Sequence, residues 1–394
     1  MMEENLGAIE TECDYDMGAV IHGEGVVTNL TYHLDGRWLL MTTNENSLHL
    51  IDSFIGEEKK KLYAKTTGVG KVAYTHHEEC ILVSADRKGA GDIRYMCMYD
   101  NRYLRCFKGH VDKLNSLSMS PVDDCFLSAS NDKTVQLWNL STPTPLGKIF
   151  LPPTCEQPFA KFDESGMVFG VLCRDNIFRR HTLKLFDARN YEAGPFQDIF
   201  PDYKLMESAA IKAARLYLNN NNNNPINNNP EGDIYNLSTP NNNNNNQNQI
   251  QSIVKKSLQT SWTSFEFSSD GNHLLLNSAS DFLLVLDGFR NDVEPLLITS
   301  RKNDAGVALG ACFSANSKYV LTGNDDNDFL LLDRNSGELK RSLTGHVAPV
   351  GCVCSNPKFD IFATGCVNSV LWIPKVLDDS NNNNSSNNNT TGLT

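Results

Sequence analysis

The sequence predicts an all-β protein, a seven-bladed β-propeller whose N-terminal strand completes the last blade. The first observation is a unit of strands and turns that recurs along the chain, most plainly at residues 104–140. The second is length: residues 17–375, without an insertion of about 50 residues, leave about 44 residues for each of seven units, which suits a four-stranded blade. The third is closure, since a ring of such blades leaves no long sheet edge exposed.

The best-defined unit, residues 104–140, opens on Gly109-His110 and ends on Trp138-Asn139. Its last strand, residues 134–138, alternates in polarity as a half-buried strand does. The turn before that strand is Asn131-Asp132-Lys133, a sequence of turn-forming residues. A Gly-His start and a Trp end at this spacing are typical of a WD repeat.

Six further units share the pattern of short strands separated by turn-forming residues. Their predicted strands are at residues 27–34, 37–43 and 47–52; 71–74, 80–85 and 93–100; 158–162, 167–173 and 182–187; 262–267, 272–278 and 282–287; 307–314, 319–323 and 328–333; and 350–355, 361–365 and 369–373. Residues 196–200 are predicted to be the outer strand of the fourth blade.

The N-terminal segment supplies the strand that the seventh unit lacks. Residues 19–21 are a short apolar stretch with no hairpin partner beside it, and the seventh unit is one strand short at its C-terminal end. We expect this stretch to pair there and close the ring. Residues 1–16 are acidic and poor in pattern and are predicted to be a disordered tail, with the propeller spanning residues 17–375.

Asparagine-rich segments interrupt and follow the repeats. Residues 203–258 form an insertion between units four and five, in which a helix over residues 206–218 is one option. Asparagine tracts bury too little apolar surface to offset the entropy lost on ordering, so they are predicted to be disordered. A disordered tail is likewise predicted at residues 376–394. The tracts of the insertion lie at residues 219–224, 227–229 and 241–249.

A buried polar network is predicted from His110, Asp132, Trp138 and a strand hydroxyl, either Ser128 or Ser130. In WD repeats the imidazole before the first strand meets the carboxylate of the turn before the third strand. Such a network satisfies polar groups that blade packing would otherwise bury unpaired. A catalytic triad is the alternative interpretation, but the strand–turn–strand setting and the Trp terminus favour a structural role.

Composition narrows the classes of function. The net charge of −12 argues against a general nucleic-acid or membrane binder, and the acidic N-terminus has no secretory signal. The 11 cysteines, an odd number, are therefore predicted to be reduced, in a cytosolic or nuclear protein. Cys352 and Cys354 lie near His346, but no second pair has ligand spacing, so core packing is favoured. No metal, cofactor or catalytic site is predicted.

Basic residues gather around units two and three of this acidic chain. One interpretation is a solvated rim. The other is an anion-recognition face on which cations bind a phosphorylated peptide through charge-assisted hydrogen bonds. The pattern of charge leaves both open. The residues of this candidate rim are Arg87, Lys88, Arg94, Arg102, Arg105 and Lys113.

The chain resembles the WD repeat-containing protein 82 / Swd-two family over about residues 20–375. The resemblance rests on residues 95–110, 117–124 and 132–138, and LSMSPVDD at 117–124 is more specific than generic WD residues. The asparagine-rich insertion and tail are not features of that family.

The resemblance implies a non-catalytic, nuclear subunit of a COMPASS-type complex, which methylates histone H3 at lysine-4. It implies tethering of the methyltransferase to RNA polymerase II through phosphorylated C-terminal repeats, and membership of a protein-phosphatase-1 complex or, in yeast-like lineages, a cleavage and polyadenylation factor. We expect charge reversal of Arg102 and Arg105 to weaken binding of such a phosphopeptide. The alternatives from other classes are a substrate receptor of a cullin-type ubiquitin ligase and an enzyme with a site in the channel.

Overall fold

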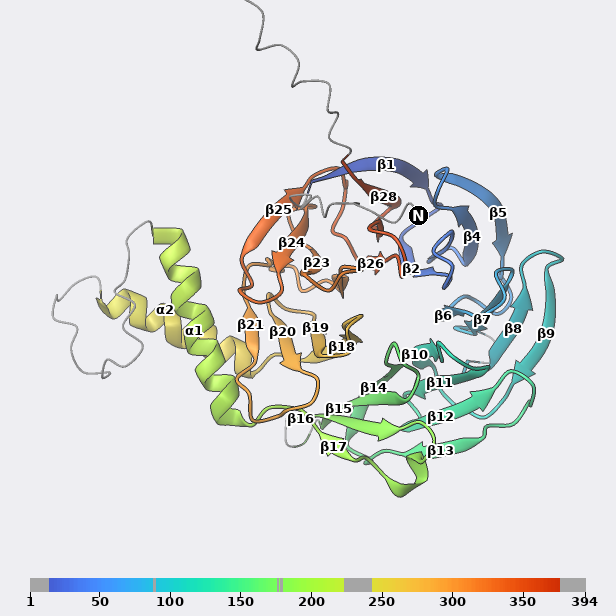
Figure 1. The fold of residues 1–394 in the computed structure, drawn as a ribbon, viewed down its shortest axis with the longest axis horizontal. Coiled ribbons are helices and arrows are strands. Elements are labelled where there is room, and N and C mark those ends of the chain that lie inside the picture. The colour runs from blue at the N-terminus through green and yellow to red at the C-terminus, as the bar shows by residue number, and fades with distance from the viewer. Residues whose placement is uncertain (1–13, 88–89, 176, 178–179, 223–242, 376–394) are drawn as a thin grey trace, which may run out of the picture.

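The computed structural model describes residues 14–87, 90–175, 177, 180–222 and 243–375. Over these residues the chain forms seven four-stranded antiparallel sheets, arranged as the blades of a ring (Figure 1). The predicted seven-bladed β-propeller is confirmed. Neither helix in the described part of the chain is long and apolar enough to cross a membrane.

The first four blades follow one another along the chain. Blade one is β2 (Val27–Tyr32), β3 (Trp38–Thr43), β4 (Ser47–Asp52) and β5 (Glu57–Tyr63); blade two is β6 (Val72–Tyr74), β7 (Cys80–Ser84), β8 (Ile93–Cys97) and β9 (Arg102–Phe107); blade three is β10 (Leu114–Met119), β11 (Cys125–Ser130), β12 (Thr134–Asn139) and β13 (Gly147–Phe150); blade four is β14 (Cys155–Phe162), β15 (Val168–Asp175), β16 (Arg180–Asp187) and β17 (Gln197–Asp198).

Three more blades complete the ring after two helices, α1 (Tyr203–Asn222) and α2 (Asn243–Leu258). Blade five is β18 (Trp262–Phe267), β19 (His273–Ser278), β20 (Leu283–Asp287) and β21 (Leu296–Ile298); blade six is β22 (Ala311–Phe313), β23 (Tyr319–Gly323), β24 (Phe329–Asp333) and β25 (Leu339–Leu343); blade seven is β26 (Cys352–Ser355), β27 (Phe362–Gly365), β28 (Asn368–Pro374) and β1 (Tyr15–His22).

The place of a strand in its blade explains its composition. The second and third strands are covered by neighbouring blades on both faces, so β3 and β12 are almost entirely buried. The fourth strand lies at the perimeter, and β5, with the sequence EEKKKLY, is largely exposed. Apolar side chains therefore form separate cores between consecutive blades. The core between blades two and three contains Phe107, Phe126 and Trp138.

The N-terminal strand closes the ring, as predicted. β1 pairs antiparallel with β28 from Tyr15 opposite Pro374 to His22 opposite Asn368. The strand begins at Tyr15, two residues before the predicted start of the propeller at residue 17, because the Tyr15 ring packs edge-on against Phe362 at 4.9 Å. The predicted disordered tail is thus wrong for residues 15 and 16, and residues 1–13 lie outside the described part of the chain.

The asparagine-rich insertion is more ordered than predicted. Asn219–Asn222 extend α1, and Asn243–Gln249 form the first half of α2. Both helices pack against blade five: α1 buries Met206, Ala209, Ala210 and Ala213 there, and α2 contributes the partly buried Ile253, Val254 and Leu258. Packing of these apolar stripes stabilises helices that asparagine alone does not favour. Residues 223–242 of the insertion and the predicted tail at 376–394 lie outside the described residues.

The prediction that all the cysteines are reduced is wrong for one pair. Cys155 of β14 and Cys173 of β15 form a disulfide, with their Cα atoms 5.7 Å apart. The two strands are hydrogen-bonded neighbours, which brings the cysteines within bonding distance although 18 residues separate them. The free cysteines of the described residues are Cys80, Cys97, Cys106, Cys125, Cys312, Cys352, Cys354 and Cys366.

Candidate functional site

The predicted polar residues of blade three meet in one network. His110 Nδ1 lies 2.8 Å from Asp132 Oδ2, and His110 Nε2 lies 2.7 Å from Ser128 Oγ. Trp138 Nε1 donates to the same Ser128 oxygen at 2.8 Å. The structure therefore places Ser128 in the network, whereas the Ser130 hydroxyl donates to a loop carbonyl at 2.9 Å.

Asp132 is held by donors on both carboxylate oxygens. Val111 N–H donates to Oδ2 at 3.1 Å, and the Thr134 N–H and hydroxyl donate to Oδ1 at 3.0 and 2.7 Å. Burial alone would raise the pKa of Asp132, but the hydrogen bonds from His110 and Thr134 outweigh it and lower the pKa to about 2. The turn thus presents an ionised carboxylate to the imidazole.

Two members of this network were not predicted. The Thr134 hydroxyl lies 3.2 Å from His110 Nδ1, and Gln136 Nε2 lies 3.1 Å from the same atom. Thr134, Gln136 and Trp138 are spaced two residues apart along β12, so all three side chains point to one face of the strand. That spacing, visible in the sequence, is the signal that identifies Thr134 and Gln136.

This network is largely shielded from solvent. His110 is 6% exposed, and Ser128 and Trp138 are not exposed at all. The Trp138 ring stacks on Phe126 at 6.0 Å and meets Phe107 edge-on at 5.8 Å. The Ser128 oxygen bonds both the imidazole and the indole N–H, which links the network to the Trp138 ring in the core between blades two and three.

Three cations of the candidate rim lie on the outer half of blade two. The Arg94 guanidinium lies over the Tyr103 ring at 5.2 Å. Arg102 begins β9, keeps 76% of its side chain exposed and lies 3.6 Å from an Asp100 oxygen. Arg105 donates to a backbone carbonyl of blade three at 2.5 Å, so part of its charge is used within the fold.

Lys113 and Arg87, two other cations of the rim, lie in loops on the ring face that carries His110. Lys113 precedes β10 and forms an ion pair of 2.9 Å with Asp86. Arg87 follows β7, and its guanidinium lies 3.5 Å from the Lys65 carbonyl oxygen. Lys88 lies outside the described residues. The structure therefore separates the rim into a perimeter group and a loop group.

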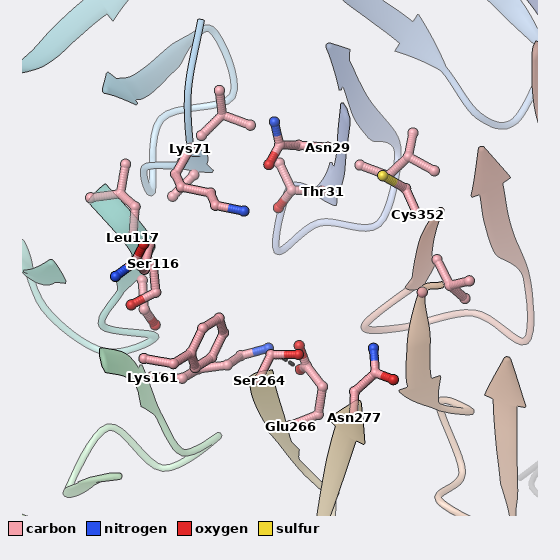
Figure 2. Close-up of a pocket in the computed structure, with 18 of the residues that line it drawn as sticks. Asn29, Thr31, Lys71, Ser116, Leu117, Lys161, Ser264, Glu266, Asn277 and Cys352 are labelled. Atoms are coloured by element: carbon pink, nitrogen blue, oxygen red, sulfur yellow. Dashed lines mark hydrogen bonds and ion pairs between the residues drawn. The ribbon is translucent and has the colours of Figure 1, made fainter. Parts of the chain in front are cut away.

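The central channel is a third candidate site. It has a volume of about 570 Å³ and is lined by the first strands of the blades together with their flanking residues. Lys71 and Lys161 extend into it, and Lys161 forms an ion pair with Glu266 of β18 (Figure 2). Burial alone would lower the pKa of Lys161, but the carboxylate of Glu266 raises it.

The channel residues were not identified from the sequence. Lys161 and Glu266 are 105 residues apart in the sequence, and neither belongs to a motif that would mark it as a functional residue. Their position on the first strand of a blade is the signal that points them toward the axis. Among the residues that the structure describes, no group of three His, Cys, Asp or Glu side chains is placed to hold a metal ion.

Comparison with known proteins agrees with the repeat pattern and the resemblance. The family model for the WD domain, G-beta repeat, matches residues 101–139 and 337–373. WD repeat-containing protein 82 of Drosophila melanogaster is 28% identical over 342 residues, which are 86% of this chain and 88% of that protein.

Two yeast proteins are similar over most of their length. Set1 complex component swd2 of Schizosaccharomyces pombe is 26% identical over 77% of this chain and 69% of its own. COMPASS component SWD2 of Saccharomyces cerevisiae is 24% identical over 86% of this chain and 88% of its own. The predicted resemblance to the WD repeat-containing protein 82 / Swd-two family is confirmed.

Proposed function

We propose that this propeller is a non-catalytic subunit of a COMPASS-type complex that methylates histone H3 at lysine-4 in the nucleus. The observation that carries the proposal is similarity along almost the whole propeller to proteins named as Set1 complex and COMPASS components. The matches cover 77% and 86% of this chain, so they extend well beyond the two repeats that the general WD model recognises.

The geometry of blade three supports a scaffold role. The one His–Asp–Ser constellation that the sequence suggested as a catalytic candidate is enclosed between blades and internally bonded. Its hydrogen bonds stiffen the loop before β10, which belongs to a face of the ring. The loops of the ring and its seven perimeter strands provide surfaces on which partners can be held relative to one another.

Affinity purification of the tagged full-length chain from nuclear extract tests the proposal. We expect co-purification of a histone methyltransferase subunit and other COMPASS subunits in amounts comparable to the bait, with an unrelated tagged WD propeller as the control. Recovery of a cullin with its linker protein, without a methyltransferase, would instead support a ubiquitin-ligase receptor. Recovery of protein phosphatase 1 or of cleavage and polyadenylation subunits alone would place the chain in those complexes.

We further propose that the perimeter cations of blade two help to bind phosphorylated C-terminal repeats of RNA polymerase II. Arg102 carries this part of the proposal because its side chain is 76% exposed and its ion pair with Asp100 is long at 3.6 Å. A phosphate group with charge near −2 and three acceptor oxygens competes well with such a weak contact. Arg105 is a poorer test than the sequence suggested, since its guanidinium also bonds within the fold.

Arg102→Glu is expected to weaken binding of a phosphorylated heptad-repeat peptide by about ten-fold, or about 1.4 kcal/mol, measured by fluorescence anisotropy at low salt. Lys340→Glu is the matched control: Lys340 lies on the outer strand of blade six, 3.7 Å from the carboxylate two residues before it, as Arg102 lies near Asp100. Equal affinity of the unmodified chain for the unphosphorylated peptide would refute phosphate recognition.

A further inference from the structure

Blade seven contains a second polar network, in which a cysteine replaces the aspartate. His346 Nε2 lies 2.7 Å from Thr364 Oγ1, and Trp372 Nε1 donates to the same hydroxyl at 2.7 Å. His346 Nδ1 lies 3.2 Å from the Cys366 sulfur. The His–Trp ring distance is 6.3 Å, the same as between His110 and Trp138 in blade three.

The sulfur of Cys366 occupies the chemical position of the Asp132 carboxylate. In blade three the imidazole Nδ1 and the N–H of the following residue, Val111, both face the carboxylate. In blade seven the imidazole Nδ1 lies 3.2 Å from the sulfur, and the backbone N–H groups of Asn368 and of Val347, again the residue after the histidine, help to lower the pKa of this thiol. This contact favours the thiolate, because a neutral thiol is a weak acceptor.

The pKa of the Cys366 thiol differs from the pKa values of the two other cysteines of blade seven. Burial acts to raise the pKa of Cys366, but the donors from His346, Asn368 and Val347 overcome it and lower the pKa to about 7. Burial raises the pKa of Cys352 to about 12 and that of Cys354 to about 11, although both lie in the same blade. His22 is a further titratable group beside this loop, with its Nδ1 atom 3.2 Å from the side-chain oxygen of Asn368.

We infer that Cys366 and His346 form a thiolate–imidazolium pair that serves as an oxidation site for hydrogen peroxide in the blade that closes the ring. The thiolate attacks one peroxide oxygen, so the S–O bond forms as the O–O bond breaks. The departing hydroxide takes the imidazolium proton and leaves as water. Sulfur is oxidised by two electrons to a sulfenic acid, and the peroxide is reduced by the same two electrons.

The position of the pair allows access and gives oxidation a consequence. Cys366 itself is 2% exposed, but Val347 and Val367, which follow His346 and Cys366 in the chain, are 69% and 37% exposed, so the two loops that hold the pair lie at the surface. Oxidation removes the anion that His346 contacts and adds an oxygen where there is little free volume. The loop between β25 and β26 then loses one of its contacts with the turn between β27 and β28, and β28 is the strand that pairs with β1.

Alkylation rates test the thiolate. The reduced full-length chain is treated with iodoacetamide from pH 5 to 9, and each cysteine is followed by peptide mass spectrometry. We expect Cys366 to react about ten-fold faster than Cys352 or Cys354 at pH 7, with half-maximal rate near pH 7. A rate equal to that of Cys352 and Cys354, or a midpoint near that of an ordinary thiol, would overturn the inference.

Two histidine variants separate charge from access. His346→Gln should raise the pH midpoint of Cys366 alkylation, whereas His110→Gln, the same change in the network of blade three, should leave it in place. If His346→Gln merely loosens the blade, Cys352 and Cys354 will also react faster while the midpoint of Cys366 stays near pH 7, and the pair is then refuted.

Peroxide tests the consequence. Hydrogen peroxide should produce a dimedone-reactive sulfenic acid at Cys366 and lower the Tm of the unmodified chain by about 3 °C. Cys366→Asp gives blade seven a carboxylate like that of Asp132 in blade three. The Tm of this variant should not change under the same treatment. An equal loss of Tm in this variant, or no dimedone adduct at Cys366, would exclude Cys366 as the oxidation site.

Discussion

Deletion of residues 1–24 is expected to lower the Tm by roughly 10 °C, because it removes β1 and reopens the ring. Tyr15 and Ile21 are 8% and 5% exposed, and burial of each contributes about 2 kcal/mol. The Tyr15 hydroxyl also donates to Asp360 at 2.7 Å, which adds about 1 kcal/mol. Loss of the strand further uncovers Phe362, against which the Tyr15 ring packs.

Thermal unfolding followed by circular dichroism measures this effect. Deletion of residues 1–13, which stops short of β1, is the matched control and should leave the Tm unchanged. If the two deletion variants have the same Tm, pairing of β1 with β28 does not stabilise the ring, and this prediction is wrong.

Trp138→Ala is expected to lower the free energy of unfolding by about 3–5 kcal/mol, since it leaves a cavity between blades two and three. Trp138 is fully buried, stacks on Phe126 and contacts Phe107. The change also removes the indole N–H that bonds Ser128. Urea unfolding at neutral pH gives the free energy directly.

Trp138→Phe separates packing from hydrogen bonding. The smaller ring keeps most of the contact with Phe126 but cannot donate to Ser128, which retains its bond to His110. Its cost should be lower than that of the alanine variant, near 1–2 kcal/mol. Similar losses in the two variants would assign the main contribution of Trp138 to the hydrogen bond, and a small loss in both would mean that blade three tolerates a gap.

Much of the fold could be predicted from local patterns. The alternation at residues 134–138 and the turn before it identify β12, and the same signals recur in every blade. Strand starts were less certain. Residues 307–314 were predicted as one strand, yet β22 begins at Ala311, because Val307 bonds the Asn303 side chain in place of a sheet partner.

The candidate sites were predicted unevenly. Because His110 and Asp132 belong to a repeat with fixed spacing, their meeting follows from the pattern. The basic rim has no such spacing: Arg102 and Lys113 are near in sequence, but the first lies at the perimeter and the second in a loop beside Asp86. The distribution of charge along the sequence does not determine on which part of a blade a cationic side chain lies.

The number of blades and the identity of the closing strand follow from the amino-acid order, since strand alternation, turn residues and repeat length are properties of neighbours in the chain. The choice of Ser128 over Ser130, the pairing of Lys161 with Glu266, and the contact of Cys366 with His346 required the folded ring. These depend on which atoms of distant segments come within about 3 Å of one another, and that is settled only when the blades pack.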